Sequence, residues 1–215
     1  MALKNKAYLP ALLLLLLALF LMLIANLAQA SSTTPFITTW EVSEDDLTIS
    51  IPLGSYNYNY HVDWGDGSVN TDISGIITHT FATPGIKTIS ISGDFPAIYF
   101  NKAGDKEKIR TIEAWGDQNW ASMRAAFRGV SSLIINASDT PNLSNVTDMS
   151  SMFREVVSLS GNFANWDTSN VTSMSKMFLL SQQFNQDISG NNVSNVTSMM
   201  SMFRMADASK QDIEH

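Results

Sequence analysis

The sequence predicts a β-sandwich near the amino terminus, followed by a solenoid of short helical turns and short strands. Two observations predict this fold class. The first is the alternation of apolar and polar residues between turn residues in 36–100, which is typical of half-buried strands. The second is a 25-residue repeat in the carboxy-terminal half, and a fixed period of this size is typical of stacked repeats.

Residues 1–30 have the composition of a signal peptide. Lys4 and Lys6 precede a Leu-rich run, and Ala28-Gln29-Ala30 has the small-x-small pattern of a cleavage site. We therefore expect the mature protein to begin at Ser31 and to be secreted or displayed on the cell surface. A retained anchor is the alternative, because the apolar run is close to the shortest length that spans a bilayer. This segment is expected to contact a membrane only before cleavage, and no other part of the chain is expected to do so.

Residues 31–100 carry the alternation that predicts the β-sandwich. Apolar and polar residues alternate from Tyr56 to Trp64, which predicts a half-buried strand with Trp64 in the core. Gly65-Asp66-Gly67 then predicts a tight turn. Thr83-Pro84-Gly85 predicts a second turn, because Pro fixes φ and Gly can take a positive φ.

Residues 101–120 are expected to connect the sandwich to the repeats. Their basic side chains are mixed with acidic ones, a pattern typical of a solvated face. Ile109, Ile112, Trp115 and Trp120 would then cap the open first end of the solenoid, because a stack of repeats needs such a cap for solubility.

Residues 121–215 contain the repeats, about 3.5 units, of which the last is expected to be truncated. The segment 146–153 recurs as 171–178 and 196–203, and a weaker copy stands at 122–127. Its apolar residues fall at i, i+3, i+6 and i+7, which places them on one face of a short helix. They form the predicted repeat core: Val146, Met149, Met152, Phe153, Val171, Met174, Met177, Phe178, Val196, Met199, Met202 and Phe203.

Two columns of the repeat allow alternative interpretations. Met sulfur is a soft ligand that could bind copper, but the Met columns recur in register with Val and Phe, which favours packing. Asn145, Asn170 and Asn195 predict a ladder in which each amide bonds the backbone of an adjacent turn. Each also begins an Asn-x-Thr sequence, which in a eukaryotic secretory protein would accept a glycan.

The repeats resemble those of the BspA-type leucine-rich-repeat surface proteins of bacteria. The similarity rests on "NWDTSNVTSMSKMF" at 165–178 and "FNQDISGNNVSNVTSMMSMF" at 184–203. The chain departs from the family pattern at Asn191, where the family has Trp, as this chain does at Trp166. The resemblance implies a leucine-rich-repeat-like solenoid on the outside of a cell.

The amino-terminal part resembles a polycystic kidney disease (PKD) domain, an immunoglobulin-like sandwich. The resemblance rests on "VDWGDGSV" at 62–69 and "HTFATPGIKTISIS" at 79–92. It implies a spacer or a weak binder of polysaccharide or protein. The residues that match the motif are Asp63, Trp64, Gly65, Asp66, Gly67, His79, Phe81, Pro84 and Gly85.

No catalytic residue, metal site or cofactor is predicted. Asp63, Asp66, Asp72 and Asp94 are candidate calcium ligands, but the spacing of a calcium loop is missing and the first two are better explained as turn caps. His79 is expected to be a hydrogen-bonded framework residue. The chain has no Cys, which excludes disulfides and a thiol nucleophile, and its net charge of −7 argues against nucleic acid.

The expected function is that of a secreted or cell-surface, non-catalytic interaction or adhesion protein. Its partner would be an extracellular protein or glycan that the sequence does not identify. A repeat array presents an extended regular surface, which suits binding. Two alternatives stay open: an accessory binding region of a larger secreted polysaccharide- or protein-degrading enzyme, and a purely structural surface stalk.

Overall fold

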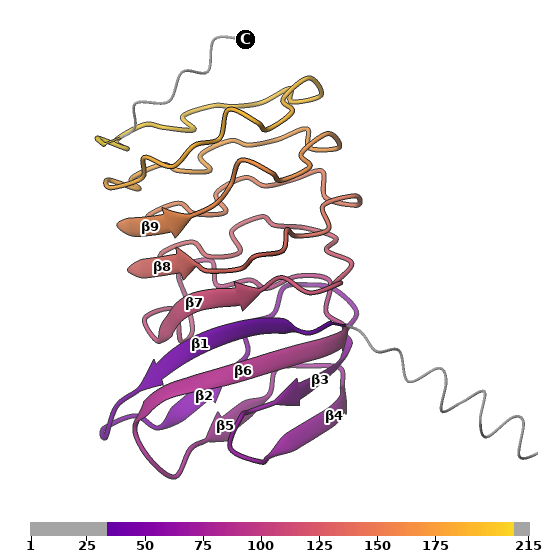
Figure 1. Cartoon of the computed structure of the whole chain (residues 1–215), viewed down its shortest axis with the longest axis vertical. Helices are drawn as coiled ribbons and strands as arrows, with labels where there is room; N and C mark the ends of the chain where they lie inside the picture. Colours follow the sequence, from indigo (N-terminus) through magenta and orange to yellow (C-terminus); the bar gives the residue numbers. More distant parts are fainter. Residues whose placement is uncertain (1–33, 209–215) are drawn as a thin grey trace, which may run out of the picture. The chain divides into compact units, whose positions relative to one another are not determined.

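The computed structural model describes residues 34–208, which belong to one compact unit and contain nine strands and no helix. Seven strands form one sheet in the order β4-β3-β6-β1-β7-β8-β9, and β2 and β5 form a separate two-stranded sheet (Figure 1). The strands are β1 (Phe36–Val42), β2 (Thr48–Ser50), β3 (Asn59–Asp63), β4 (Val69–Ile73), β5 (Thr78–Thr80), β6 (Gly85–Asp94), β7 (Ile109–Ala114), β8 (Ser132–Ile135) and β9 (Ser158–Gly161).

The strand β1 joins the two halves of the chain. On one side it pairs antiparallel with β6, and on the other side it pairs antiparallel with β7. Its alternate residues Phe36, Trp40 and Val42 are buried, as the period of two in a strand requires. From β7 onward the pairing becomes parallel, from β7 to β8 and from β8 to β9.

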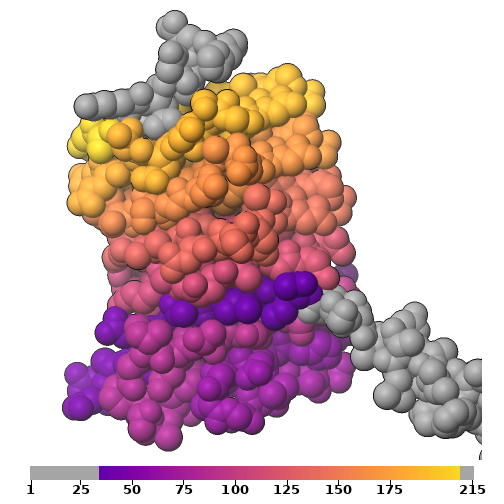
Figure 2. Space-filling model, in the orientation of Figure 1, coloured from indigo at the N-terminus to yellow at the C-terminus, as the bar shows by residue number. Residues whose placement is uncertain are grey.

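The repeats are coils that stack in register on this sheet. Asp148 bridges Ser173, and Ser173 bridges Ser198, each pair in parallel orientation. The weaker copy at 122–127 belongs to the same stack, because the Phe127 N–H donates to the Met152 carbonyl at 2.9 Å. Figure 2 shows the coils as successive layers that continue directly from the amino-terminal strands.

The predicted helical turns are wrong. The first half of each copy of the repeated segment holds an isolated bridge, the second half is a run of turns, and residues 34–208 hold no helix. Ser151, Lys176 and Ser201, in the middle of each copy, have φ values of 58°, 59° and 56°. A right-handed helix needs φ near −60°, so a residue in the left-handed region ends it. The three-residue spacing of the methionines instead marks a turn, closed in one copy by the Met177 N–H and the Met174 carbonyl at 3.2 Å.

The backbone hydrogen bonds of the repeats run between coils. The Phe153 N–H donates to the Met177 carbonyl at 3.0 Å, and one coil further the Phe178 N–H donates to the Met202 carbonyl at 3.0 Å. These bonds replace the i to i−4 bonds that would define a helix. The leucine-rich-repeat-like solenoid of short helices is therefore not the fold of this chain.

The predicted PKD- or immunoglobulin-like sandwich, separate from the repeats, is also wrong. Four strands of 36–100, β1, β3, β4 and β6, share one sheet with β7, β8 and β9, and the second sheet has only β2 and β5. The strand predicted from Tyr56 to Trp64 is limited to β3, and Tyr56 is 43% exposed. The segment 101–120, expected to be a solvated connector with a cap, supplies β7 to the middle of the sheet, and Ile109, Ile112, Trp115 and Trp120 are fully buried.

One apolar core runs from the amino-terminal strands into the coils. At the level of β1 and β7, the rings of Phe36, Trp115 and Trp120 lie within 6.1 Å of one another, centroid to centroid. Further along, Phe127, Phe153, Phe178 and Phe203 stack with centroid separations of 5.7, 5.9 and 5.5 Å and interplanar angles of 9° or less. The Phe column is thus the axis around which the coils pack.

Candidate functional site

The repeat residues singled out from the sequence lie inside the stack. Of the twelve, nine are buried, and Val196, Met199 and Phe203 in the last described coil are partly buried and pack against the core. The methionines belong to the same apolar core as the Phe column, where a flexible thioether can fill irregular space. These side chains hold the coils together, and they leave the polar side chains of the same turns for contact with solvent or a partner.

Two polar rows run along the outside of the coils. Thr147, Thr172 and Thr197 are exposed and form the threonine row. The Thr172 hydroxyl donates to the Thr147 carbonyl at 3.1 Å, and the Thr197 hydroxyl donates to the Thr172 carbonyl at 3.2 Å. These threonines are not among the predicted site residues, although they recur with the same 25-residue period, which is the signal that could have identified them.

Asn145, Asn170 and Asn195 form the asparagine row, which is likewise exposed. The Asn170 amide donates to the Ser144 carbonyl at 3.0 Å, and the Asn195 amide donates to the Ser169 carbonyl at 2.7 Å. Each bond reaches the backbone of the preceding coil. Hydrogen bonds of this kind fix the side chains of the row before any partner arrives.

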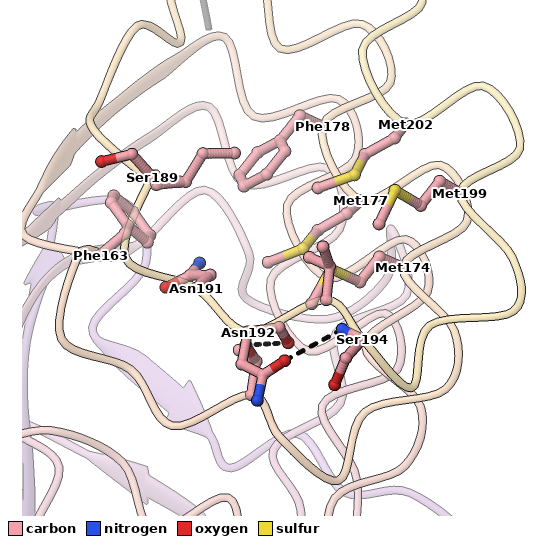
Figure 3. A pocket seen from close by; sticks show the side chains of 13 residues that line it. Phe163, Met174, Met177, Phe178, Ser189, Asn191, Asn192, Ser194, Met199 and Met202 are labelled. Atoms are coloured by element: carbon pink, nitrogen blue, oxygen red, sulfur yellow. Dashed lines mark hydrogen bonds between the residues drawn. The ribbon is translucent and has the colours of Figure 1, made fainter. Parts of the chain in front are cut away.

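A cavity of about 360 Å³ lies between the last two described coils (Figure 3). Its lining is mostly apolar and includes Met174, Met177, Met199 and Met202. Asn191 is among the polar residues that line it, and the Oδ1 atom of Asn191 is buried with no hydrogen-bond partner among residues 34–208. The departure of Asn191 from the repeat pattern was visible in the sequence, but the cavity was not predicted.

The residues of the amino-terminal motif form a second cluster. Trp64 is fully buried and stacks on the His79 ring at a centroid distance of 4.8 Å, and Phe81 meets the same ring edge-on at 4.7 Å. His79 Nε2 lies 2.7 Å from Asp66 Oδ2. Gly65 takes a φ of 75°, and a Cβ there would clash with the Thr88 carbonyl, so the turn needs glycine.

Other motif residues shape the two turns. Asp63 accepts a hydrogen bond from the Gly65 N–H at 2.9 Å, and Asp66 accepts one from the Ser68 N–H at 2.9 Å. Gly67 and Gly85 take φ values of 92° and 110°, and Pro84 and Gly85 are exposed. These contacts hold the backbone around Trp64.

The candidate calcium ligands Asp63, Asp66 and Asp94 do not converge on one site. Asp63 and Asp66 cap the turn, whereas Asp94 lies opposite Asn59 in the ladder of β3 and β6. Within residues 34–208, no group of three or more His, Cys, Asp or Glu side chains is placed to hold a metal ion.

Residues 34–208 contain no helix that is long and apolar enough to cross a bilayer. The predicted signal peptide lies outside the described residues, and no finding supports it.

Asp66 makes the fold of this cluster sensitive to acid. The hydrogen bond from His79, together with the one from the Ser68 N–H, lowers the pKa of Asp66 from 3.8 to about 2. Because the folded-state pKa lies below the ordinary value, the ionised carboxylate stabilises the fold above about pH 4, and this contribution is lost as the pH falls towards about 2.

We expect Asp66→Asn to melt below the parent at pH 5 and to approach it as the pH falls to 2. Melting temperatures of the two proteins at several pH values measure this difference, and other carboxylates cancel because both proteins share them. Parallel curves over the whole range would show that Asp66 is not stabilised by its neighbours.

The comparisons with known proteins identify one family. The family model described as "Mycoplasma protein of unknown function, DUF285" matches residues 99–215, which is more than half of the chain. No curated protein and no solved structure matches. These findings correct the predicted resemblance to BspA-type leucine-rich-repeat proteins and give no support to the PKD resemblance. The match covers the coils that carry both polar rows and the cavity. Because it spans more than half of the sequence, the chain belongs to the DUF285 family of Mycoplasma proteins of unknown function.

Proposed function

We propose that this protein is a non-catalytic binding protein that acts outside the cell or on its surface. It recognises an extracellular protein or glycan through the threonine and asparagine rows. The observation that carries this proposal is the rows themselves: exposed hydroxyl and amide groups that recur with the 25-residue period, four of which are held by hydrogen bonds to the preceding coil.

The fixed geometry of the rows favours binding. Each hydroxyl of Thr172 and Thr197 uses its proton on a backbone carbonyl, which leaves its oxygen lone pairs directed away from that bond. Paired backbones lie about 4.8 Å apart, so equivalent groups repeat at about that interval. A partner with polar groups in a regular series can contact several coils at once. Each contact is weak, but little entropy is lost because the side chains are already ordered.

The composition of the surface fits the same proposal. The rows contain no charged side chain, and the chain as a whole carries a net charge of −7. Recognition through the rows would therefore depend on neutral hydrogen bonds and be little affected by salt, since screening acts on charges. Hydroxyl-rich glycans and extended polypeptides both offer such groups.

The test compares two triple variants of the threonine row. Replacing Thr147, Thr172 and Thr197 together by Val removes the hydroxyl groups, whereas replacing all three by Ser keeps them and is the matched control. The proteins are screened against panels of glycans and extracellular proteins, and affinities for any hit are measured by biolayer interferometry. We expect the Val variant to bind about tenfold or more weakly, since it loses up to three neutral hydrogen bonds, and the Ser variant to bind like the parent.

Two results would overturn the proposal. One is a partner that the Val variant binds as tightly as the parent does, and the other is no binding to either panel, which would favour a structural role. The location is tested on cells that make the protein, where added protease should degrade it without lysis.

A further inference from the structure

We propose that the cavity between the last two described coils binds a small, flat aromatic molecule with one hydrogen-bond donor, of which indole is the simplest example. This site is separate from the polar rows. The proposal rests on three observations: the repeat fills the equivalent space with an indole ring one coil earlier, a buried acceptor lacks a partner, and methionines surround the space.

The equivalent position one coil earlier is Trp166. Its side chain is only 3% exposed and lies 5.1 Å from Phe163, 5.3 Å from Trp115 and 6.3 Å from Phe153, measured between ring centroids. Trp166 therefore occupies the interior of its coil as a packed aromatic ring. In the next coil the residue 25 positions later is Asn191.

The backbone around the two residues is built alike. The Trp166 N–H donates to the Phe163 carbonyl at 3.4 Å, and the Asn191 N–H donates to the Ile188 carbonyl at 3.0 Å. Asn191 thus enters the stack from the same kind of turn, with a much smaller side chain, and Ile188 stands where the earlier coil has Phe163. These two exchanges account for the cavity of about 360 Å³, which is within the size range of small-molecule sites.

The polar character of the cavity is defined by Asn191. Its Oδ1 atom is buried and has no hydrogen-bond partner among residues 34–208, an arrangement that is rare because buried polar atoms are normally paired. Asn191 lines the cavity beside Asn192, whose own carbonyl already accepts a hydrogen bond from the Thr168 hydroxyl at 2.8 Å (Figure 3). An N–H or O–H group on the ligand would give the Oδ1 atom of Asn191 its missing hydrogen-bond partner.

The remaining lining suits an aromatic ring. Met174, Met177, Met199 and Met202 place their thioethers around the space, and Phe178 adds a ring (Figure 3). Sulfur atoms make favourable contacts with the edges of aromatic rings, and Met side chains adapt to the shape they enclose. The lining residues carry no charge, so the ligand is expected to be neutral.

The experiment uses the full chain and titrates indole, with benzofuran as a probe of the same shape that lacks a donor. Calorimetry should show saturable binding of one indole per chain, and benzofuran should bind about tenfold more weakly because the Asn191 acceptor stays unpaired. Asn191→Leu should remove the preference between the two probes.

Asn191→Trp fills the cavity with the side chain found in the preceding coil. We expect it to lose indole binding and to melt at a higher temperature than the parent. Gln182→Trp adds the same residue at an exposed position in the same coil and should leave binding unchanged. The proposal fails if the parent does not bind indole, as it would if a later part of the chain occupies the cavity. It also fails if Asn191→Trp binds indole like the parent, or if Asn191→Leu still prefers indole.

Discussion

Deleting residues 179–203 should leave a folded protein that melts at a lower temperature. The deletion removes one 25-residue period and joins Phe178 to Arg204, which reproduces the Phe203–Arg204 junction. The coils that remain can still stack in register, so the cost is the loss of one interface between neighbouring coils, together with its Phe178–Phe203 ring contact. Thermal melting followed by circular dichroism measures the effect.

Deleting the twelve residues 184–195 is the matched comparison and should abolish cooperative folding of the last coils. It shifts the Met and Phe columns by half a period, so that apolar side chains reach solvent and Ser and Asn side chains enter the interior without partners. The bond from the Phe178 N–H to the Met202 carbonyl would also lose its register. Equal melting temperatures for the two deletions would show that the period does not define the packing.

Phe153→Ala should destabilise the protein by about 3–5 kcal/mol, as removal of a large buried aromatic side chain does. Phe153 is fully buried and stacks between Phe127 and Phe178, at centroid distances of 5.7 and 5.9 Å. Alanine would leave a hole that both neighbouring coils border. Equilibrium unfolding in urea gives the change in free energy.

Phe203→Ala is the control at the end of the described column. Phe203 is only partly buried and stacks on Phe178 from one side at 5.5 Å, so its loss should cost clearly less than that of Phe153. Equal losses at the two positions, or a loss below about 1 kcal/mol at Phe153, would contradict the view that the ring stack is the axis of the coils.

The helix prediction was wrong because β-turns and a helix produce the same spacing of apolar residues. Val171, Met174, Met177 and Phe178 have the spacing of one helical face, but a chain of β-turns also returns to the same side after three residues. The choice between the two depends on φ at positions such as Lys176, where 59° excludes a helix. Nothing in the Ser-Lys sequence requires that value. The acceptors supplied by the next coil, such as the Met200 carbonyl for the Lys176 N–H at 2.9 Å, stabilise it.

Some features of the candidate site could be predicted from the sequence, and others depend on the folded chain. Asn170 could be singled out because its amide recurs every 25 residues, and Asn191 because it breaks the pattern set by Trp166. The cavity beside Asn191 depends on how far the neighbouring coils close over the missing ring, which is a property of the packed chain. Likewise, the contact between Asp66 and His79 joins residues 13 positions apart and required the turn after Trp64 to be folded.

Local composition determined the period, the polar and apolar sides of each coil, and the turns at Gly65 and Gly85, because periodicity and glycine content act through neighbouring residues. Pairing between distant segments decided the rest. β1 pairs with β6 on one edge and with β7 on the other, and this joins β3, β4 and β6 to β7, β8 and β9 in one sheet. The physical reason is that every residue except Pro offers the same backbone N–H and C=O groups, so their partners are selected by the packing of the whole chain.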